Sequence, residues 1–199
     1  MRKNKYSHRD YEKLLEEVSN LKKELELTKR MVHKKNYLIQ SMDQELQLHK
    51  MTDVLTDSYN RKFLLKKYRE AINMFKRWGF SITLCSFDLD DLEGANKKYG
   101  SDFGDSLLMS FSKLCQYLIR DDIDSLFRIE EDDFLVILID CNKQNATRIC
   151  QKIQREYNAI TEGHTLSYGI LEIKDPNKFS LEDYLKKVTT ELEINKQIN

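Results

Sequence analysis

The sequence predicts an α/β domain, a sheet with helices packed against it, preceded by one long helix. The apolar runs SITLCSF and FLVILI are typical of buried strands, and stretches of helical period alternate with them. Residues 1–50 contain neither glycine nor proline and repeat apolar side chains in steps of three and four, as a long helix does. The chain is therefore expected to consist of a helical extension, residues 1–52, and a globular domain, residues 53–199.

Composition narrows the classes of function. The chain has 199 residues and a formal net charge of +0, so it lacks the basic excess of a general nucleic-acid binder, and we expect no nucleic-acid partner. No apolar run is long enough to span a membrane, and the start MRKNKYSHRDYEK has no signal-peptide core, which together predict a cytoplasmic protein. The four cysteines lack metal-ligand spacing, and Cys85 and Cys115 fall within apolar patterns that predict buried thiols.

The N-terminal extension carries a heptad pattern. Its apolar residues alternate four and three apart, with polar interruptions at Thr28 and Lys35. The seam consists of Leu14, Val18, Leu21, Leu25, Val32, Ile39, Met42 and Leu46. Because a lone helix cannot bury such a stripe, we expect a parallel homodimeric coiled coil. A long helix folded against its own domain and a partly disordered arm are the alternatives.

The globular part is expected to alternate helices and strands around one hairpin. Thr56 or Asp57 is positioned to cap the helix that follows, which carries Phe63, Leu64 and Tyr68. The further elements expected are a strand over 80–89, helices over 91–99 and 102–119, a hairpin over 125–128 and 133–139, a helix over 144–160, a strand over 165–173 and a last helix from 181 onward.

Acidic residues gather at the tips of two of these strands. The first strand reaches Asp88 within SFDLDDLEGANKKYGSDFGD, residues 86–105, and the second is preceded by the acidic hairpin of FRIEEDDFLVIL, residues 127–138. Two strand ends bearing carboxylates can hold a hard divalent cation, which usually brings nucleotide phosphates with it.

These motifs resemble the GGDEF family, the diguanylate cyclases that join two GTP into cyclic di-GMP. Asp88, Asp90, Asn96, Gly100, Gly104 and Asp105 stand in register with the family's first motif. DVLTDSYNRKFL, residues 53–64, resembles the family's entry sequence, and TLSYGI, residues 165–170, its late strand. The resemblance covers residues 53–199 and implies a mixed five-stranded sheet surrounded by helices, related to adenylyl cyclase catalytic domains.

The resemblance also implies roles for individual residues. Asp88, the carbonyl of Leu89 and Asp132 would hold Mg²⁺ or Mn²⁺, and Asp133 stands where the family has a catalytic glutamate. Asn96 and Asp105 match the pair that reads the guanine edge, and Lys196 matches the lysine that reaches the phosphates. Without ligands, Asp88 would be a turn former or helix cap, Asn96 and Asp105 would be helix-terminal residues, and Lys196 would be a solvated lysine.

The signature itself departs from the family. Where the family has R-Y-G-G-D-E-F, this chain has R-I-E-E-D-D-F, Arg128 to Phe134, so Glu130 and Glu131 replace two glycines. Hairpin-tip glycines are expected to adopt positive φ and to admit a ligand close to the backbone. A phosphate-facing lysine is replaced by Glu93. The arginine of the family's R-x-x-D inhibition site is missing, with Arg120 out of register by one, so feedback binding of cyclic di-GMP there is not expected.

Three functions remain open at this point. The favoured one is a degenerate GGDEF protein of cyclic di-GMP signalling, catalytically impaired, which acts as a dimeric regulatory or scaffold module and binds GTP or a regulatory protein partner. The second is an active diguanylate cyclase that uses Mg²⁺ to make cyclic di-GMP from two GTP. The third is a purely structural coiled-coil protein whose globular end binds no ligand.

Overall fold

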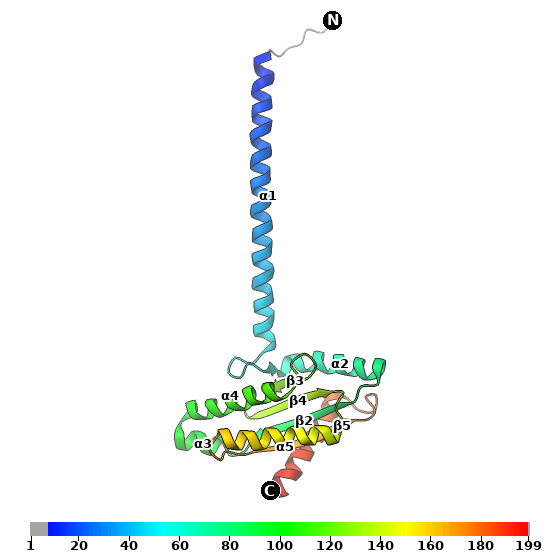
Figure 1. Cartoon of the computed structure of the whole chain (residues 1–199). Coiled ribbons are helices and arrows are strands. Elements are labelled where there is room, and N and C mark those ends of the chain that lie inside the picture. The colour runs from blue at the N-terminus through cyan, green and yellow to red at the C-terminus, as the bar shows by residue number, and fades with distance from the viewer. Residues whose placement is uncertain (1–7, 199) are drawn as a thin grey trace. The chain divides into compact units, whose positions relative to one another are not determined.

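The computed structural model describes the backbone of residues 8–198 and, within that range, every side chain except those of residues 8, 10, 43–50 and 198. The chain divides into two compact units, Met1–Lys50 and Met51–Asn199. Figure 1 shows the element order along the chain. The elements are α1 (His8–Met51), β1 (Tyr59–Asn60), α2 (Arg61–Trp78), β2 (Ile82–Leu89), α3 (Leu92–Tyr99), α4 (Ser101–Leu118), β3 (Ser125–Arg128), β4 (Asp133–Ile139), α5 (Lys143–Ile160), β5 (Leu166–Ile173) and α6 (Leu181–Ile198).

The first unit is the single long helix α1. The seam side chains from Leu14 to Met42 lie 42–63 % exposed, the lowest value at Val18 and the highest at Ile39. Leu46, the last predicted seam residue, lies outside the described side chains. Such a row of uncovered apolar side chains in water calls for a partner surface.

The second unit is built on a mixed five-stranded sheet in the order β1-β3-β4-β2-β5. The strands β2, β3, β4 and β5 pair antiparallel, and β1 pairs parallel to β3 through Tyr59 and Phe127. The inner strand β2 is buried along most of its length, because it has neighbours on both edges and helices on both faces. This arrangement is the mixed sheet that the sequence led us to expect.

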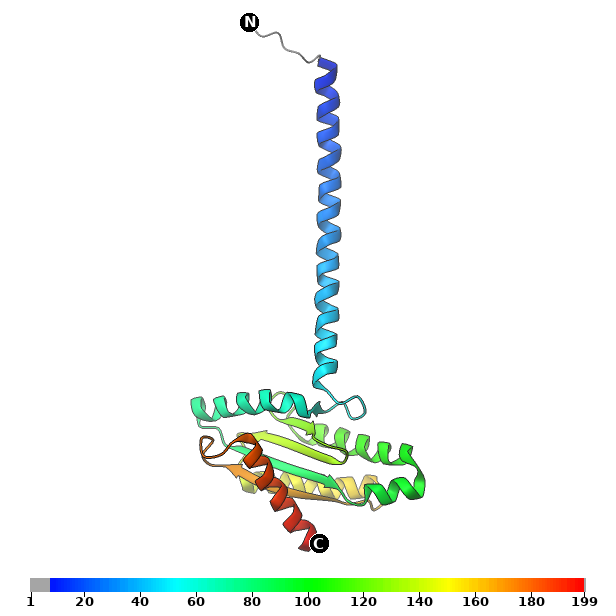
Figure 2. The same cartoon turned by 180° about the vertical axis from the view of Figure 1, so that it is seen from behind.

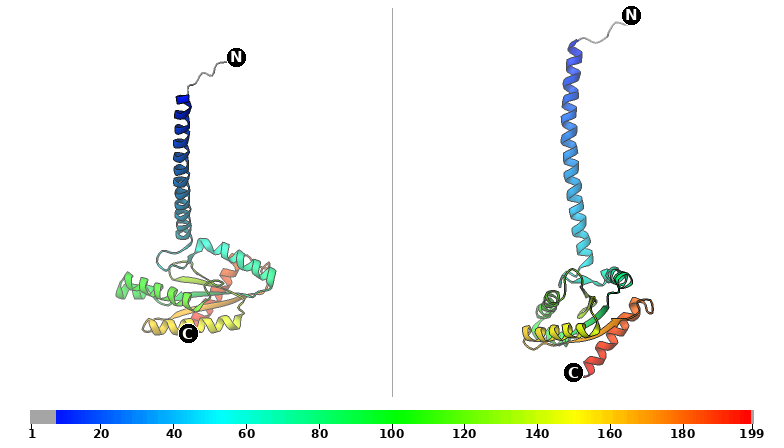
Figure 3. Two further views of the ribbon diagram at one scale, coloured as in Figure 1. Left: turned by 45° about the horizontal axis from the view of Figure 1, so that its top comes forward. Right: turned by 45° about the vertical axis from the view of Figure 1, so that its right-hand side comes forward.

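Helices cover both faces of the sheet. Helices α3, α4 and α5 pack on one face, where Phe111 of α4 meets Phe134 of β4 with ring centroids 4.6 Å apart. Helices α2 and α6 pack on the other face through Leu64, Tyr68 and Val188. Figure 2 shows α6 in front of the sheet with α5 behind it, and the right-hand view of Figure 3 shows the two helix layers on either side.

Two local features differ from the sequence prediction. The two-residue strand β1 was not predicted, because it has no apolar run of its own; it pairs with β3, and Tyr59 also bridges Thr52. The predicted caps of α2 are wrong: the N-cap is Asn60, whose side chain accepts from the backbone N–H groups of Lys62 and Phe63 at 3.0 and 3.3 Å. Thr56 instead donates its hydroxyl to Asp53 at 2.7 Å, and Asp57 takes a left-handed φ of 58°.

Two predictions from composition can be compared with the structure. All four cysteines, including Cys85 and Cys115, are buried free thiols. Among residues 8–198, no helix combines the length and the apolar character that a membrane span requires.

Candidate functional site

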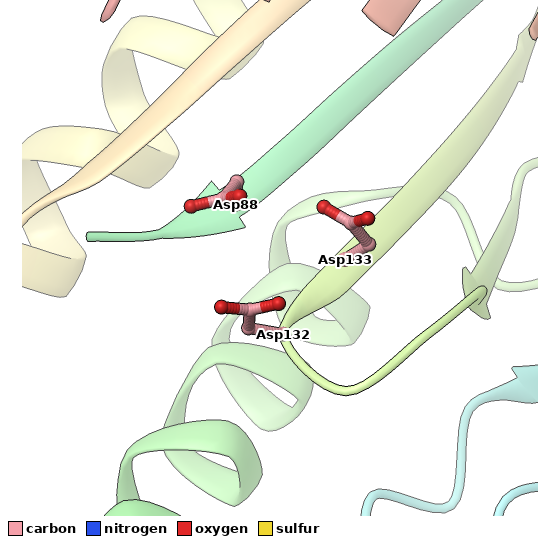
Figure 4. A group of neighbouring side chains, drawn as sticks. All are labelled: Asp88, Asp132 and Asp133. Carbon is pink, nitrogen blue, oxygen red and sulfur yellow. The ribbon is translucent and has the colours of Figure 1, made fainter. Parts of the chain in front are cut away.

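Three carboxylates meet where β2 ends and the β3–β4 hairpin returns. The antiparallel register sets Asp88 of β2 directly opposite Asp133, the first residue of β4. Asp132 precedes it in the hairpin, and one oxygen from each of the three side chains lies within 4.8 Å of the others. Figure 4 shows the three carboxylates around one shared space.

Burial raises the pKa of two of these carboxyl groups, Asp133 and Asp88. Burial is the main cause at Asp133, whose pKa rises to about 6, and the charges of Asp88 and Asp132 add to the effect. Burial also raises the pKa of Asp88, although an ammonium group partly offsets it. A cluster that resists full ionisation is one that gains from a bound cation.

The donor set fits a hard divalent cation. Mg²⁺ and Mn²⁺ prefer carboxylate and carbonyl oxygens, and these three side chains supply such oxygens on two strand ends held in fixed register. Leu89, whose carbonyl was assigned a ligand role, ends β2 with its side chain buried. Its part in metal binding stays a prediction.

The lysine from the chain's last helix reaches this cluster. Lys196 Nζ lies 2.8 Å from Asp88 Oδ2. The preceding residue, Asn195, donates its side-chain amide to the carbonyl of Tyr168 at 2.9 Å, which ties the end of α6 to β5. The sequence around Lys196 matches the family poorly, and yet the helix places its ammonium at the acidic cluster.

The two candidates for guanine recognition lie on neighbouring helices, Asn96 within α3 and Asp105 within α4. Asn96 packs tightly against Gly104: a Cβ atom on Gly104 would lie 1.9 Å from Asn96 Oδ1. That oxygen is buried and has no hydrogen-bond partner among the described groups. A buried acceptor without a donor costs free energy, and this oxygen would gain from a hydrogen-bond donor.

An arginine contacts each of the two extra glutamates of the signature hairpin. Glu130 accepts from Arg61, at the start of α2, with Nη1 to Oε1 at 2.8 Å. The backbone carbonyl of Glu131 accepts from Arg128 Nε and Nη2 at 3.2 and 2.7 Å. Arg128 in turn pairs with Asp53 at 3.0 Å, which joins the hairpin to the loop before α2.

We expected that replacing glycine at the hairpin tip would strain the backbone through a positive φ, and the structure does not show this strain. Neither Glu130 nor Glu131 is among the described residues with positive φ. The hairpin closes instead through the N–H of Ile129, which donates to the carbonyl of Asp133 at 2.8 Å. The two glutamates therefore act through charge and bulk rather than through strain.

Sequence reasoning missed the contact of one arginine at the edge of the site, Arg61. Arg61 is the arginine of the motif SYNRK, which the family resemblance includes. Its contact with Glu130 could not be predicted, because the two residues are 69 positions apart. Arg120 clamps Asp124 with Nε at 2.9 Å and Nη2 at 2.8 Å, and it also donates to the carbonyl of Ile139. Arg120 is thus engaged within the fold, in agreement with its being out of register for an inhibitor site.

A cleft of about 680 Å³ adjoins the carboxylate cluster on the face covered by α2 and α6. Ser86 and Leu135 from the sheet, the Arg61–Glu130 pair and the α6 residue Thr189 are among its lining groups. Asp133 lines the cleft and also belongs to the cluster, so the cleft and the cluster share this carboxylate.

A family model described as "Diguanylate cyclase, GGDEF domain" matches residues 50–199, well over half of the chain. This chain belongs to the GGDEF-domain family. Diguanylate cyclase DgcS of Shewanella oneidensis is 32% identical over 121 residues, which cover 61% of this chain and 40% of the relative. Probable diguanylate cyclase DgcJ of Escherichia coli is 26% identical over 156 residues, with coverage of 77% and 31%. This GGDEF chain thus spans less than half the length of both curated relatives.

Solved GGDEF structures match the fold. The coiled coil and GGDEF domain of DgcB from Caulobacter crescentus, in complex with c-di-GMP, gives a TM-score of 0.74 at 18% identity and covers 92% of this chain and 94% of that chain. SiaD from Pseudomonas aeruginosa, in complex with its activator SiaC, gives 0.69 at 20% identity, with coverage of 96% and 75%. At these identities the likeness establishes the GGDEF fold.

Proposed function

We propose that this GGDEF domain is a regulatory module of cyclic di-GMP signalling that binds GTP together with Mg²⁺ or Mn²⁺ and is impaired in turning it over. The observation that carries the binding half is the convergence of Asp88, Asp132 and Asp133 within 4.8 Å, with Lys196 at 2.8 Å from Asp88. The unpartnered Oδ1 of Asn96 adds a place for the base.

Each residue has a distinct part in binding. The three carboxylates would hold the cation, which when bound neutralises charge on the phosphates. The Lys196 ammonium is positioned to contact phosphate oxygens, and Asn96 with Asp105 offers an amide and a carboxylate that match the hydrogen-bonding edge of guanine. None of these residues is replaced by a chemically different group relative to the family.

Three departures support impaired turnover. Glu93 replaces a phosphate-facing lysine and is paired with Lys97 at 2.6 Å. Glu130 and Glu131 add two negative charges to the hairpin. Asp133 is one methylene shorter than the family's glutamate, a loss of reach of about 1.5 Å, and catalytic geometry tolerates such errors poorly.

The module is proposed to act as a homodimer through α1. The exposed seam from Leu14 to Met42 supports this, because a second copy of the same helix offers a matching apolar stripe. A dimer would also bring two GGDEF domains together, which the family's chemistry requires.

An active diguanylate cyclase is the second candidate, and one observation favours it. Because Arg61 holds the carboxylate of Glu130, that charge is partly neutralised and the hairpin is compatible with an open nucleotide site. In that case two protomers would each hold one GTP, and the 3′-hydroxyl of one nucleotide would attack the α-phosphate of the other.

Calorimetric titration with GTP and Mg²⁺ tests the binding proposal. The wild-type protein is expected to bind, Asp88→Ala to bind at least about tenfold more weakly, as loss of about 1.4 kcal/mol gives, and the exposed Asp122→Ala to match wild type. A folded wild-type protein that gives neither heat nor thermal stabilisation with GTP would contradict the proposal.

A further inference from the structure

The ammonium of Lys196 contacts one carboxylate of the group that is proposed to hold the cation. Its Nζ is 2.8 Å from Asp88 Oδ2, and the two side chains are only 30 % and 16 % exposed. Partial exclusion of water strengthens such a contact relative to a surface ion pair. The lysine therefore serves as the counter-ion of the cluster when no other cation is present.

The packing of α6 on β5 fixes where the Lys196 side chain begins. Gly169 of β5 lets α6 approach so closely that a Cβ there would lie 2.4 Å from the carbonyl oxygen of Val188 and 2.5 Å from the N of Leu192. Asn195 then ties the last turn of α6 to the carbonyl of Tyr168 at 2.9 Å. These two contacts between α6 and β5, both just before Lys196 in the chain, position its side chain at Asp88.

Several carboxylates surround the single positive charge of this ammonium. Asp88 forms the ion pair with it, Asp133 and Asp90 lie close enough to interact with its charge, and Glu193 lies on its own helix. Among the described residues, Lys196 makes the only ion pair with any member of the three-carboxylate cluster. A divalent cation that enters the cluster must therefore share Asp88 with this ammonium or displace it.

We propose that Lys196 is a specificity-determining residue that makes the site select a divalent cation bound to a polyphosphate over the bare cation. A bare cation meets a site that already holds a positive charge, so its binding is weakened. A cation that arrives with phosphates offers the displaced ammonium new anionic partners, so the lysine helps rather than hinders. This inference rests on the proposed function, that the cluster binds a divalent cation with a nucleotide.

The proposal predicts opposite effects of one substitution on two ligands. Removing the ammonium in Lys196→Met should tighten binding of Mn²⁺ alone about tenfold, which corresponds to about 1.4 kcal/mol. The same substitution should weaken binding of a non-hydrolysable GTP analogue in the presence of Mn²⁺ by a similar factor. A residue with a merely structural role would weaken both or neither.

The test is a titration of free Mn²⁺ by electron paramagnetic resonance, with and without the GTP analogue, on full-length protein. Lys187→Met is the matched control, because Lys187 is an exposed lysine on the same helix and its removal changes the net charge equally. Circular dichroism establishes that each variant is folded, and Lys196→Gln provides a second neutral replacement.

The outcomes separate this inference from the proposed function. Tighter Mn²⁺ binding with weaker nucleotide binding in Lys196→Met, and no change in Lys187→Met, supports it. Unchanged or weaker Mn²⁺ binding in both Lys196 variants overturns it while the proposed function stands. A wild-type protein that binds Mn²⁺ neither alone nor with the analogue overturns the proposed function and this inference with it.

Discussion

Arg61 Nη1 lies 2.8 Å from Glu130 Oε1, which joins the first residue of α2 to the tip of the signature hairpin. Glu130 stands where the GGDEF family has a glycine, and this contact gives its carboxylate a cationic partner. Both side chains are about 60 % exposed, at 61 % and 62 %, so the pair is expected to contribute little to folding. Its effect is instead on the charge that an entering nucleotide meets.

Removing Arg61 should therefore weaken nucleotide binding without unfolding the protein. In Arg61→Ala the Glu130 carboxylate is released, and we expect GTP affinity to fall by roughly two- to fivefold, since an exposed pair contributes about 1 kcal/mol or less. Glu130→Gly should reverse the loss in the Arg61→Ala background. Calorimetry measures both, with Lys62→Ala, an exposed neighbour, as the control. Equal affinities in Arg61→Ala and wild type would show that Glu130 does not influence the site.

The seam of α1 should control the oligomeric state. Leu21→Asp combined with Leu25→Asp places charges at two adjacent seam positions, where burial against a second helix is costly, and we expect a monomer by sedimentation equilibrium. Ser19→Asp with Asn20→Asp places the same charges off the seam and should leave the dimer intact. A stable dimer of the seam variant would mean that α1 is not the dimer interface.

Charges beside the seam predict a parallel, in-register pair of helices. Glu17 and Glu24 come directly before seam positions, and Lys22 and Lys29 come directly after seam positions. In two parallel helices in register, this spacing pairs Glu17 with Lys22 of the second copy and Glu24 with Lys29 of the second copy.

A single cysteine tests this orientation, because α1 contains no native cysteine and the four native thiols are buried. Leu21→Cys should form a disulfide-linked dimer under mild oxidation, while Lys23→Cys on the outer face should not. The reverse pattern, or no cross-link at Leu21→Cys in a protein shown to be dimeric, would exclude this register.

The raised pKa of Asp133 predicts a pH dependence of stability in metal-free protein. Its ordinary pKa is 3.8 and its pKa in the fold is about 6, so between these values the folded state binds more protons than the unfolded state. Stability should therefore fall as pH rises through about 4 to 6.

Thermal denaturation in the presence of a chelator measures the effect of Asp133. Asp133→Asn removes the titrating group, so its melting temperature should fall less between pH 4 and pH 6, by a few degrees in a domain of this size. Asp122→Asn, an exposed carboxylate, is the control. Parallel pH profiles for wild type and Asp133→Asn would contradict the shifted pKa.

Gly169 should be irreplaceable because α6 lies against it. A Cβ at this position would meet the backbone of Val188 and Leu192 at 2.4–2.9 Å, and backbone cannot rotate away. Gly169→Ala is expected to destabilise the domain by about 1–3 kcal/mol, as overpacking does, and to weaken Mn²⁺-dependent nucleotide binding by shifting Lys196. In Gly94→Ala the new methyl group meets only the side chain of Asp91, so this control should cost little in denaturant unfolding.

Much of the fold could be predicted because strands and helices here leave strong local patterns. The hairpin over 125–128 and 133–139 agrees with β3 and β4, and the register that follows sets Asp88 opposite Asp133. The strand β1 could not be found in this way, since a two-residue segment has no period and depends on its partner β3. The cap at Asn60 was missed because Thr56 and Asp57 are equally good capping residues by type.

The carboxylates of the candidate site could be located from sequence, but not the contacts that set their charge. Asp132 and Asp133 are adjacent to an apolar strand and stand out as a motif. The Arg61–Glu130 and Lys196–Asp88 pairs join positions far apart in the chain, and only the packing of α2 and α6 on the sheet brings them together. These long-range pairs set the charge balance of the candidate site, and local sequence patterns carry no sign of them.

Incubation of the purified protein with GTP and Mg²⁺, then Mn²⁺, with products resolved by chromatography, tests the central claim most directly. The account predicts that GTP stabilises the protein against heat while cyclic di-GMP stays at the level of an Asp88→Ala control. Cyclic di-GMP well above that control would show that the glutamate-bearing hairpin still supports turnover and that the protein is an active diguanylate cyclase.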